Sequence, residues 1–277
     1  MTPASPRTRR PTTSRLVLAL LAALLAVGAV ACSDAPTKKE IEKADDGIDP
    51  SIVPIFTSEA LLPVVQELGS VFLIDHAGTT FQYSAKEPSV LAQRVRDGVR
   101  PALWIDLAQV LEPFASDTAA NGPPQPMGND TMQFVVTEAY GGPNPTLEIF
   151  GDGPSPARTG LCEPAAPCGL AAQKLLTDEG ITPAPDTVYP EGINVVAALK
   201  EEQIDAALLY RSDANRIRTR LRFFPLPDPG VGERTYQTLR LREDAIGEEF
   251  QSWIATSPDA EAILVKWGYR PRPGRAT

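Results

Sequence analysis

Short apolar runs alternate with amphipathic helical segments along most of this chain, from residue 52 to residue 267. The apolar run at 52–56 is followed by 59–68, where leucine and valine recur at helical spacing. The same criteria predict further strands at 71–75, 79–84, 102–105, 132–137, 147–150, 204–210, 222–226 and 236–241, and further helices at 88–97, 107–114, 169–177, 194–203, 245–255 and 259–267. Alternating strands and helices favour right-handed βαβ units in mainly parallel sheets covered by helices on both faces. The sequence therefore predicts an α/β fold.

The first 31 residues have the three parts of a secretory signal. A basic start carries four arginines, an apolar core covers 16–30, and mostly small residues at 28–31 precede Cys32. The apolar run is shorter than the roughly 20 residues that span a bilayer, which disfavours a permanent transmembrane helix. Small residues directly before a cysteine resemble the lipobox of bacterial lipoproteins. We expect a lipid on Cys32 and an extracytoplasmic, membrane-anchored protein; ordinary cleavage that leaves Cys32 a free thiol is the alternative.

Composition distinguishes a tether from a folded region. Residues 32–51 are polar, charged and poor in large apolar side chains, as in a flexible tether. The first 31 residues hold four of the 26 Lys and Arg and none of the 35 Asp and Glu, so 22 basic residues remain against 35 acidic ones. Nucleic-acid binding needs clustered basic residues, so this acidic balance argues against a nucleic-acid partner.

The residues that catalysis or metal binding commonly require are scarce. The chain has a single histidine, His76, which we expect at the surface or in a turn. The segment 153–157 comes closest to the G-x-S-x-G motif of serine hydrolases but lacks its last glycine. No phosphate-binding loop and no Cys-x-x-Cys pair is present. We expect no enzyme activity, no cofactor and no structural metal, and a secreted hydrolase is a remote alternative.

Two of the three cysteines lie close together before a predicted helix. Cys162 and Cys168 are six positions apart, and an exported chain reaches an oxidising compartment, so a disulfide that closes this small loop is expected. Such a bridge would fix the backbone at a helix N-terminus, where free amides can hold an anion. A disulfide that only stabilises the loop is the alternative.

Several segments resemble motifs of one protein family and occur in the same order as in that family. Residues 162–169 resemble the D-P-x-x-V-P-A-G stretch of the periplasmic molybdate-binding proteins, the solute receptors of oxyanion ABC importers. The similarity extends to the helix at 89–94, to N-V-V-A-A-L at 194–199, to A-L-L-Y-R-S-D-A at 207–214, and to S-P-D-A-E-A-I-L at 257–264 with W-G-Y at 267–269. It covers most of residues 52–270. The chain is thereby identified as a candidate member of that family.

The resemblance implies a type II solute-binding fold, in which two α/β lobes hold a tetrahedral dianion with neutral donors and no Lys or Arg. It assigns binding hydroxyls to Ser89 and Tyr210 and binding backbone amides to Cys168 and Val195. A cap role for Ser89 and a backbone-anchored role for Tyr210 are the alternatives. The family's first binding serine is replaced by Ala60.

Ser58 or Thr57 could substitute for that serine from a different position. Glu59, beside the expected site, would repel a dianion unless its side chain points away. These departures place molybdate itself in question. We therefore include Ser58 among the predicted ligand-binding residues.

The resemblance also implies a domain division and partners. We expect the first lobe at 52–117 and 223–277 and the second at 118–222, with cleft closure on ligand binding. The partners would be molybdate or a related oxyanion, an ABC permease, and the membrane through the N-terminal lipid of a monomer. The alternative is a lipoprotein with the receptor fold that has lost its anion site and serves as an adaptor for other envelope proteins.

Overall fold

The computed structural model describes residue 49 and residues 51–116 and 120–270. The signal, Cys32 and most of the tether that the sequence predicts lie outside these residues. Within the described residues, no helix is both long enough and apolar enough to cross a membrane. The strands described form two five-stranded sheets, each flanked by helices, and we call these two layered units the first and second lobes.

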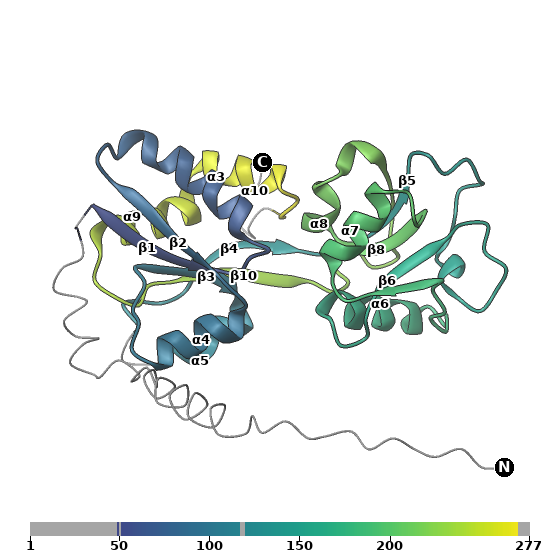
Figure 1. Cartoon of the computed structure of the whole chain (residues 1–277), viewed down its shortest axis with the longest axis horizontal. Helices are drawn as coiled ribbons and strands as arrows, with labels where there is room; N and C mark the ends of the chain where they lie inside the picture. The colour runs from purple at the N-terminus through teal and green to yellow at the C-terminus, as the bar shows by residue number, and fades with distance from the viewer. Residues whose placement is uncertain (1–48, 50, 117–119, 271–277) are drawn as a thin grey trace, which may run out of the picture. The chain divides into compact units, whose positions relative to one another are not determined.

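The first sheet has the strand order β2-β1-β3-β10-β4 (Figure 1). Its strands are β1 (Ile52–Thr57), β2 (Thr80–Ala85), β3 (Leu103–Leu107), β4 (Gln125–Asp130) and β10 (Arg234–Leu239). β1 pairs in parallel with β2 and β3, whereas β10 is antiparallel to both β3 and β4. All strands of this sheet except β10 therefore point the same way. β10 is the strand that returns the chain from the second sheet.

The second sheet has the order β7-β6-β8-β5-β9 and repeats this arrangement. Its strands are β5 (Met132–Thr137), β6 (Thr159–Cys162), β7 (Thr187–Tyr189), β8 (Ala206–Tyr210) and β9 (Leu221–Phe224). β6 is parallel to β7 and β8, and β5 is antiparallel to β8 and β9. The reversed strand is again the one that brings the chain into the sheet. Both sheets are thus mainly parallel, which confirms the predicted class.

Helices cover both faces of the first sheet (Figure 1). They are α3 (Leu62–Phe72), α4 (Pro88–Arg96), α5 (Ala108–Ala115), α9 (Ala245–Thr256) and α10 (Pro258–Lys266). Strand β1 shows why: Val53 and Ile55 pack into a core with α3, α9 and α10, whereas Phe56 packs into a separate core with α4 and α5. Successive side chains of a strand point to opposite faces, so an uninterrupted apolar run requires a cover on each face.

The second sheet is also covered on both faces. α6 (Pro167–Asp178) lies on one face, and α7 (Gly192–Lys200) and α8 (Arg211–Asn215) lie on the other (Figure 1). One continuous cluster of buried side chains joins these helices to the strands.

Two segments expected to be strands are helical. Residues 71–75 complete α3 and form the 3₁₀ helix η1 (Leu73–Asp75). Phe72 is responsible, because it continues the buried stripe of α3 and stacks on Phe81 and against Phe250. Residues 147–150 form the 3₁₀ helix η2 (Leu147–Phe150). Short apolar runs do not by themselves distinguish a strand from a buried helical turn.

Strands β4, β6 and β7 and helix α8 were not expected from the sequence. β6 and β7 are only four and three residues long, too short for a periodic pattern. β4 contains Pro126 and Gly128 and forms because it pairs along β10. The expected division placed residues 118–222 in the second lobe, but this pairing puts β4 in the first sheet. The chain crosses to the second sheet at Thr131 and returns between Phe224 and Arg234.

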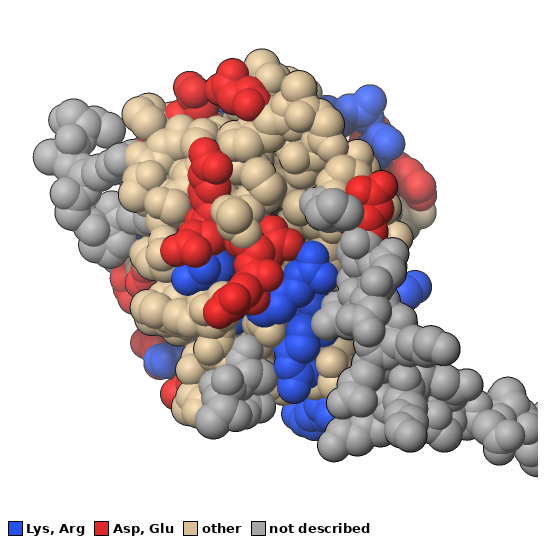
Figure 2. All heavy atoms as spheres, turned by 90° about the vertical axis from the view of Figure 1, so that its left-hand side faces the viewer, with Lys and Arg blue, Asp and Glu red and all other residues tan. Residues whose placement is uncertain are grey.

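Acidic and basic side chains are mixed on the face of the first lobe that Figure 2 shows. Ion pairs of this lobe join Arg240 Nη1 to Glu248 Oε2 at 2.7 Å and Arg242 Nη2 to Asp244 Oδ2 at 2.8 Å. These arginines are therefore neutralised locally.

Candidate functional site

The residues that the sequence predicts as ligand-binding all follow parallel strands. Ser58 follows β1, Ser89 lies in α4 after β2, Cys168 lies in α6 after β6, Val195 lies in α7 after β7, and Tyr210 ends β8. Carboxyl ends of parallel strands share one edge of a sheet, where α/β proteins bind ligands. The two serines therefore lie at the carboxyl edge of the first sheet, and the other three residues lie at the corresponding edge of the second.

Contacts between the two lobes occur at these edges. Arg216, which follows α8, donates from Nη2 to the carbonyl oxygen of Ala60 at 2.8 Å. Asn215 donates from Nδ2 to the carbonyl oxygen of Lys266 at 2.9 Å. Ala60 belongs to the turn that follows β1 and Ser58. The segment that carries one predicted binding residue is therefore already in contact with the second lobe.

The hydroxyl groups of the two predicted binding serines of the first lobe, Ser58 and Ser89, have no hydrogen-bond acceptor among the described residues. Ser89 is exposed at the second position of α4, and among the described residues neither its hydroxyl nor its amide has an acceptor. Glu87 is the N-cap of that helix, so the expected capping role of Ser89 is wrong. Ser58 is half-buried, and its hydroxyl also has no partner among the described residues. Glu59 is exposed in the turn before α3.

The expected disulfide between Cys162 and Cys168 is present, with Cα atoms 5.7 Å apart. It joins the end of β6 to the first turn of α6, so the intervening turn folds tightly onto the helix. At Gly169 a Cβ atom would lie 1.9 Å from the carbonyl oxygen of Glu163, which leaves room only for glycine. The loop thereby fixes the orientation of the N-terminal amides of α6.

Those amides are available to a ligand. Pro167, at the first position of α6, has no N–H, and the first amide that bonds back to the N-cap Ala166 is that of Leu170, at 2.9 Å. The amides of Cys168 and Gly169 have no acceptor among the described residues. Free amides at the start of a 12-residue helix carry the positive end of its dipole and favour an anion.

Tyr210 lies beside this helix start. Its side chain is 3% exposed, and its hydroxyl approaches the carbonyl oxygen of Pro167 only weakly, at 3.5 Å. Burial raises the pKa of the Tyr210 hydroxyl above its usual value of 10, so the group keeps its proton and remains a donor. The structure thus places the Tyr210 hydroxyl close to the Cys168 turn.

Val195 occupies a different position from the one expected for a binding amide. α7 begins at Gly192, and the Val195 amide already donates to the carbonyl oxygen of Glu191 at 3.3 Å. The amides without an acceptor among the described residues are those of Gly192 and Ile193. The N-terminal end of α7 therefore offers free amides at Gly192 and Ile193. These lie two to three positions before the Val195 amide that the family resemblance assigned.

Arg234 was not predicted from the sequence. It begins β10, and its guanidinium carbon lies 3.1 Å from the centre of the Tyr210 ring. It also lines a cavity of about 480 Å³ together with Leu107, at the carboxyl end of β3. Stacking on a tyrosine holds a guanidinium through cation–π attraction of about 0.5–2 kcal/mol and leaves its N–H groups free to donate. A cation therefore stands beside the predicted binding tyrosine.

His76 lies away from these edges. It precedes β2, at the amino end of that strand, where its Nδ1 contacts the carbonyl oxygen of Phe72 at 2.8 Å and its Nε2 contacts Glu249 at 3.2 Å.

Comparison with known protein families identifies the family to which this chain belongs. The family described as bacterial extracellular solute-binding protein matches residues 53–270, which include both sheets and all the residues above. The chain belongs to this family. Its fold is the type II architecture of such proteins, in which the chain crosses twice between two lobes.

Individual relatives share this architecture. The molybdate-binding protein ModA of Mycobacterium bovis is 25% identical over 257 residues, which cover 90% of this chain and 95% of the relative. Two solved structures share the fold. The substrate-binding domain of a putative molybdenum ABC transporter from Clostridium difficile has a TM-score of 0.66 at 13% identity, with 80% of this chain and 99% of that chain covered. The periplasmic molybdate-binding protein of Azotobacter vinelandii has a TM-score of 0.59 at 16% identity, with coverages of 79% and 99%.

Buried carboxylates in this solute-binding protein lie near the same edges. Burial raises the pKa of Asp106, at the end of β3, to about 6, and the negative charge of Glu87 adds to the effect. Burial likewise raises the pKa of Asp130, at the end of β4, to about 6, although Ser212 donates to this carboxylate at 2.6 Å. Burial also raises the pKa of Asp213. When ionised, these carboxylates repel an anion bound at the same edges. The positive charge of Arg234 partly offsets that repulsion.

Asp106 gives the solute-binding protein a distinct pH dependence. Its folded pKa of about 6 lies above the ordinary value of 3.8, so the folded state holds this proton more tightly than the unfolded state. The resulting stability is present below pH 3.8 and is lost as the pH rises through 6. We predict that Asp106→Asn raises the free energy of unfolding by about 2 kcal/mol at pH 7.5 and by little at pH 4.

Urea denaturation at the two pH values measures this difference. Asp152→Asn, which alters an exposed carboxylate, is the matched control and should change neither value by more than about 0.5 kcal/mol. An Asp106→Asn variant whose stabilisation is equal at both pH values would contradict the buried-carboxylate account.

Proposed function

We propose that this protein captures a tetrahedral oxyanion, molybdate in the first instance, between its two lobes and delivers it to an ABC permease. One observation carries the proposal: available donors lie at the carboxyl edges of both sheets. The hydroxyls of Ser58 and Ser89 and the amides at the start of α6 have no acceptor among the described residues, and the buried hydroxyl of Tyr210 has only a weak contact with the carbonyl oxygen of Pro167. Neutral donors oriented in advance hold an oxyanion through charge-assisted hydrogen bonds.

The choice of molybdate rests on the relatives. The mycobacterial relative is named for molybdate binding, and its similarity covers nearly the whole of both chains. Ala60 stands where the related family has a serine, so Ser58 supplies the first hydroxyl in this protein. Arg234 adds a positive charge beside Tyr210 and offsets the buried carboxylates.

The cellular setting belongs to the same proposal. A lipid on Cys32 anchors a monomer at the outer face of the membrane, and residues 32–51 serve as a tether that keeps the cleft within reach of the permease. Metabolic labelling with a tagged fatty acid tests the anchor. The natural chain should take up the label, and Cys32→Ser should not; equal labelling of both would overturn the lipid assignment.

Two conservative variants test the anion site. Ser89→Ala and Tyr210→Phe each remove one hydroxyl donor to a charged ligand, a contact worth about 1.5–3 kcal/mol. We predict that each weakens molybdate binding by about 10- to 100-fold in isothermal titration calorimetry, with unchanged stability in the absence of ligand. Tyr210→Phe retains the ring on which Arg234 stacks, so any loss reports the hydroxyl alone.

Matched controls alter the same groups elsewhere in the protein. Ser70→Ala removes an exposed hydroxyl on α3 that donates to the carbonyl oxygen of Gln66. Tyr140→Phe removes a buried hydroxyl at the far end of the second sheet. Both should bind molybdate as the natural chain does. A natural chain that is stabilised by none of molybdate, tungstate, sulfate and phosphate would refute the proposal and favour the adaptor alternative.

A further inference from the structure

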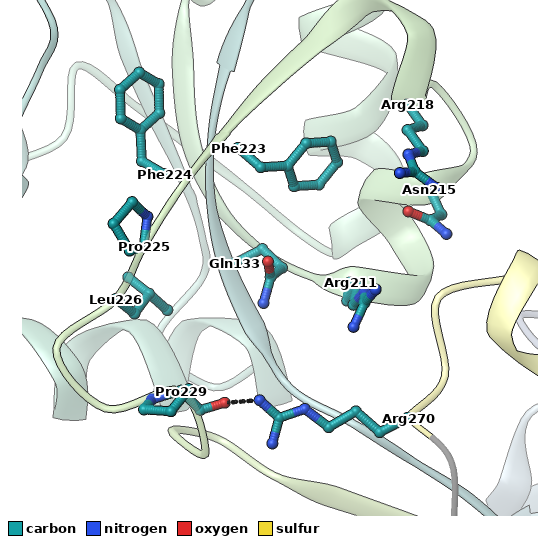
Figure 3. Close-up of a pocket in the computed structure, with 10 residues that line it drawn as sticks. All are labelled: Gln133, Arg211, Asn215, Arg218, Phe223, Phe224, Pro225, Leu226, Pro229 and Arg270. Atoms are coloured by element: carbon teal, nitrogen blue, oxygen red, sulfur yellow. Dashed lines mark hydrogen bonds between the residues drawn. The ribbon is translucent and has the colours of Figure 1, made fainter. Parts of the chain in front are cut away.

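A second cavity, of about 440 Å³, lies beside the crossover that leads to β10 and is lined mostly by residues of the second lobe. Figure 3 shows residues from several elements around it: Gln133 from β5, Arg211 and Asn215 from α8, Arg218 from η3 (Arg218–Arg220), Phe223 from β9, and Arg270 from the end of the described chain. The volume is within the range of small-molecule sites, about 300–1,000 Å³.

Three arginines line this cavity without a carboxylate partner. None of the ion pairs of the described residues involves Arg211, Arg218 or Arg270. Arg270 donates to the carbonyl oxygen of Pro229, which holds its side chain along one side of the cavity (Figure 3). The side chains of Arg211 and Arg218 make no hydrogen bond within the described residues.

Other arginines in the described part of the chain do have acidic partners. The chain has a formal net charge of −9, and Arg158, Arg240 and Arg242 each pair with an acid at 2.7–2.8 Å. Three unpaired cations around one cavity repel one another, and a bound anion would replace that repulsion with attraction. The planar guanidinium group also presents paired N–H donors that match two oxygens of a carboxylate or a phosphate.

The remaining wall is apolar and aromatic. Phe223 is 37% exposed although it lies in a strand, and in Figure 3 its ring projects toward the cavity. Leu226 and Pro225 extend this surface along the crossover. Gln133 adds an amide that can donate and accept. A bare inorganic anion would leave the apolar wall uncovered, whereas an organic anion would cover it.

We propose that this cavity is a second binding site, for an organic oxyanion that carries at least two negative charges on a small apolar body. None of the residues that line it is among the donors proposed for the oxyanion, so the second site does not depend on the function proposed for the cleft. Tyr210 faces the start of α6, whereas its neighbour Arg211 lines the cavity on the α8 side of the sheet. A phosphate monoester and an aromatic dicarboxylate both have the required chemistry.

Titration with phenyl phosphate and with phthalate, each followed by isothermal titration calorimetry on the full chain, tests the site and distinguishes the two anionic groups. We expect at least one probe to bind at least fivefold more tightly than inorganic phosphate, and to do so equally in the presence of saturating molybdate. Arg211→Gln with Arg218→Gln should weaken that probe at least tenfold. Arg220→Gln, which removes the same charge from the same 3₁₀ helix but does not line the cavity, should change it less than twofold.

Three results would overturn the second site. They are the absence of binding by both probes, displacement of the bound probe by molybdate, and equal weakening by the double variant and by Arg220→Gln. Circular dichroism of each variant confirms that it is folded. Failure of molybdate to bind the natural chain would refute the cleft function alone, because the probes are measured independently of it.

Discussion

The arrangement of the two lobes depends on the point where the two crossing strands pair. Asp130, the last residue of β4, lies opposite Arg234, the first residue of β10. Asp130 is fully buried and accepts hydrogen bonds from the Thr131 amide at 2.9 Å and the Ser212 hydroxyl at 2.6 Å. The positive charge of Arg234 partly offsets the cost of burying this carboxylate. Both crossovers and the start of α8 are therefore fixed together, and this fixes the edge that Tyr210 occupies.

The proposed anion site combines two ways of holding a negative charge. Helix-start amides and hydroxyls are neutral donors whose orientation is set by the backbone, above all by the disulfide turn before α6. Arg234 is a cation whose guanidinium stacks on the ring of Tyr210. The fixed donors favour one geometry of anion, and the arginine compensates for the buried carboxylates of Asp106 and Asp130.

Local sequence was enough to predict most of the first lobe and the disulfide. Apolar runs and helical spacing are properties of neighbouring residues, and the loop between Cys162 and Cys168 is short. Arg234 could not be identified in this way, because its position depends on residues that are distant in the chain. It lies opposite Asp130 in the β4–β10 register, and its guanidinium stacks on the Tyr210 ring. The same applies to β4, whose Pro126 and Gly128 indicated a loop. The family resemblance assigned a binding amide to Val195, whereas α7 begins at Gly192 and the Val195 amide donates to the carbonyl oxygen of Glu191.

Anomalous X-ray diffraction from crystals grown with molybdate measures the central claim most directly, because the metal of the anion gives its own signal. The account predicts one strong peak between the lobes, with anion oxygens within hydrogen-bond distance of the Ser89 hydroxyl, the Tyr210 hydroxyl and the Cys168 amide. A peak in contact with only one lobe, or one confined to the arginine-lined cavity, would contradict it.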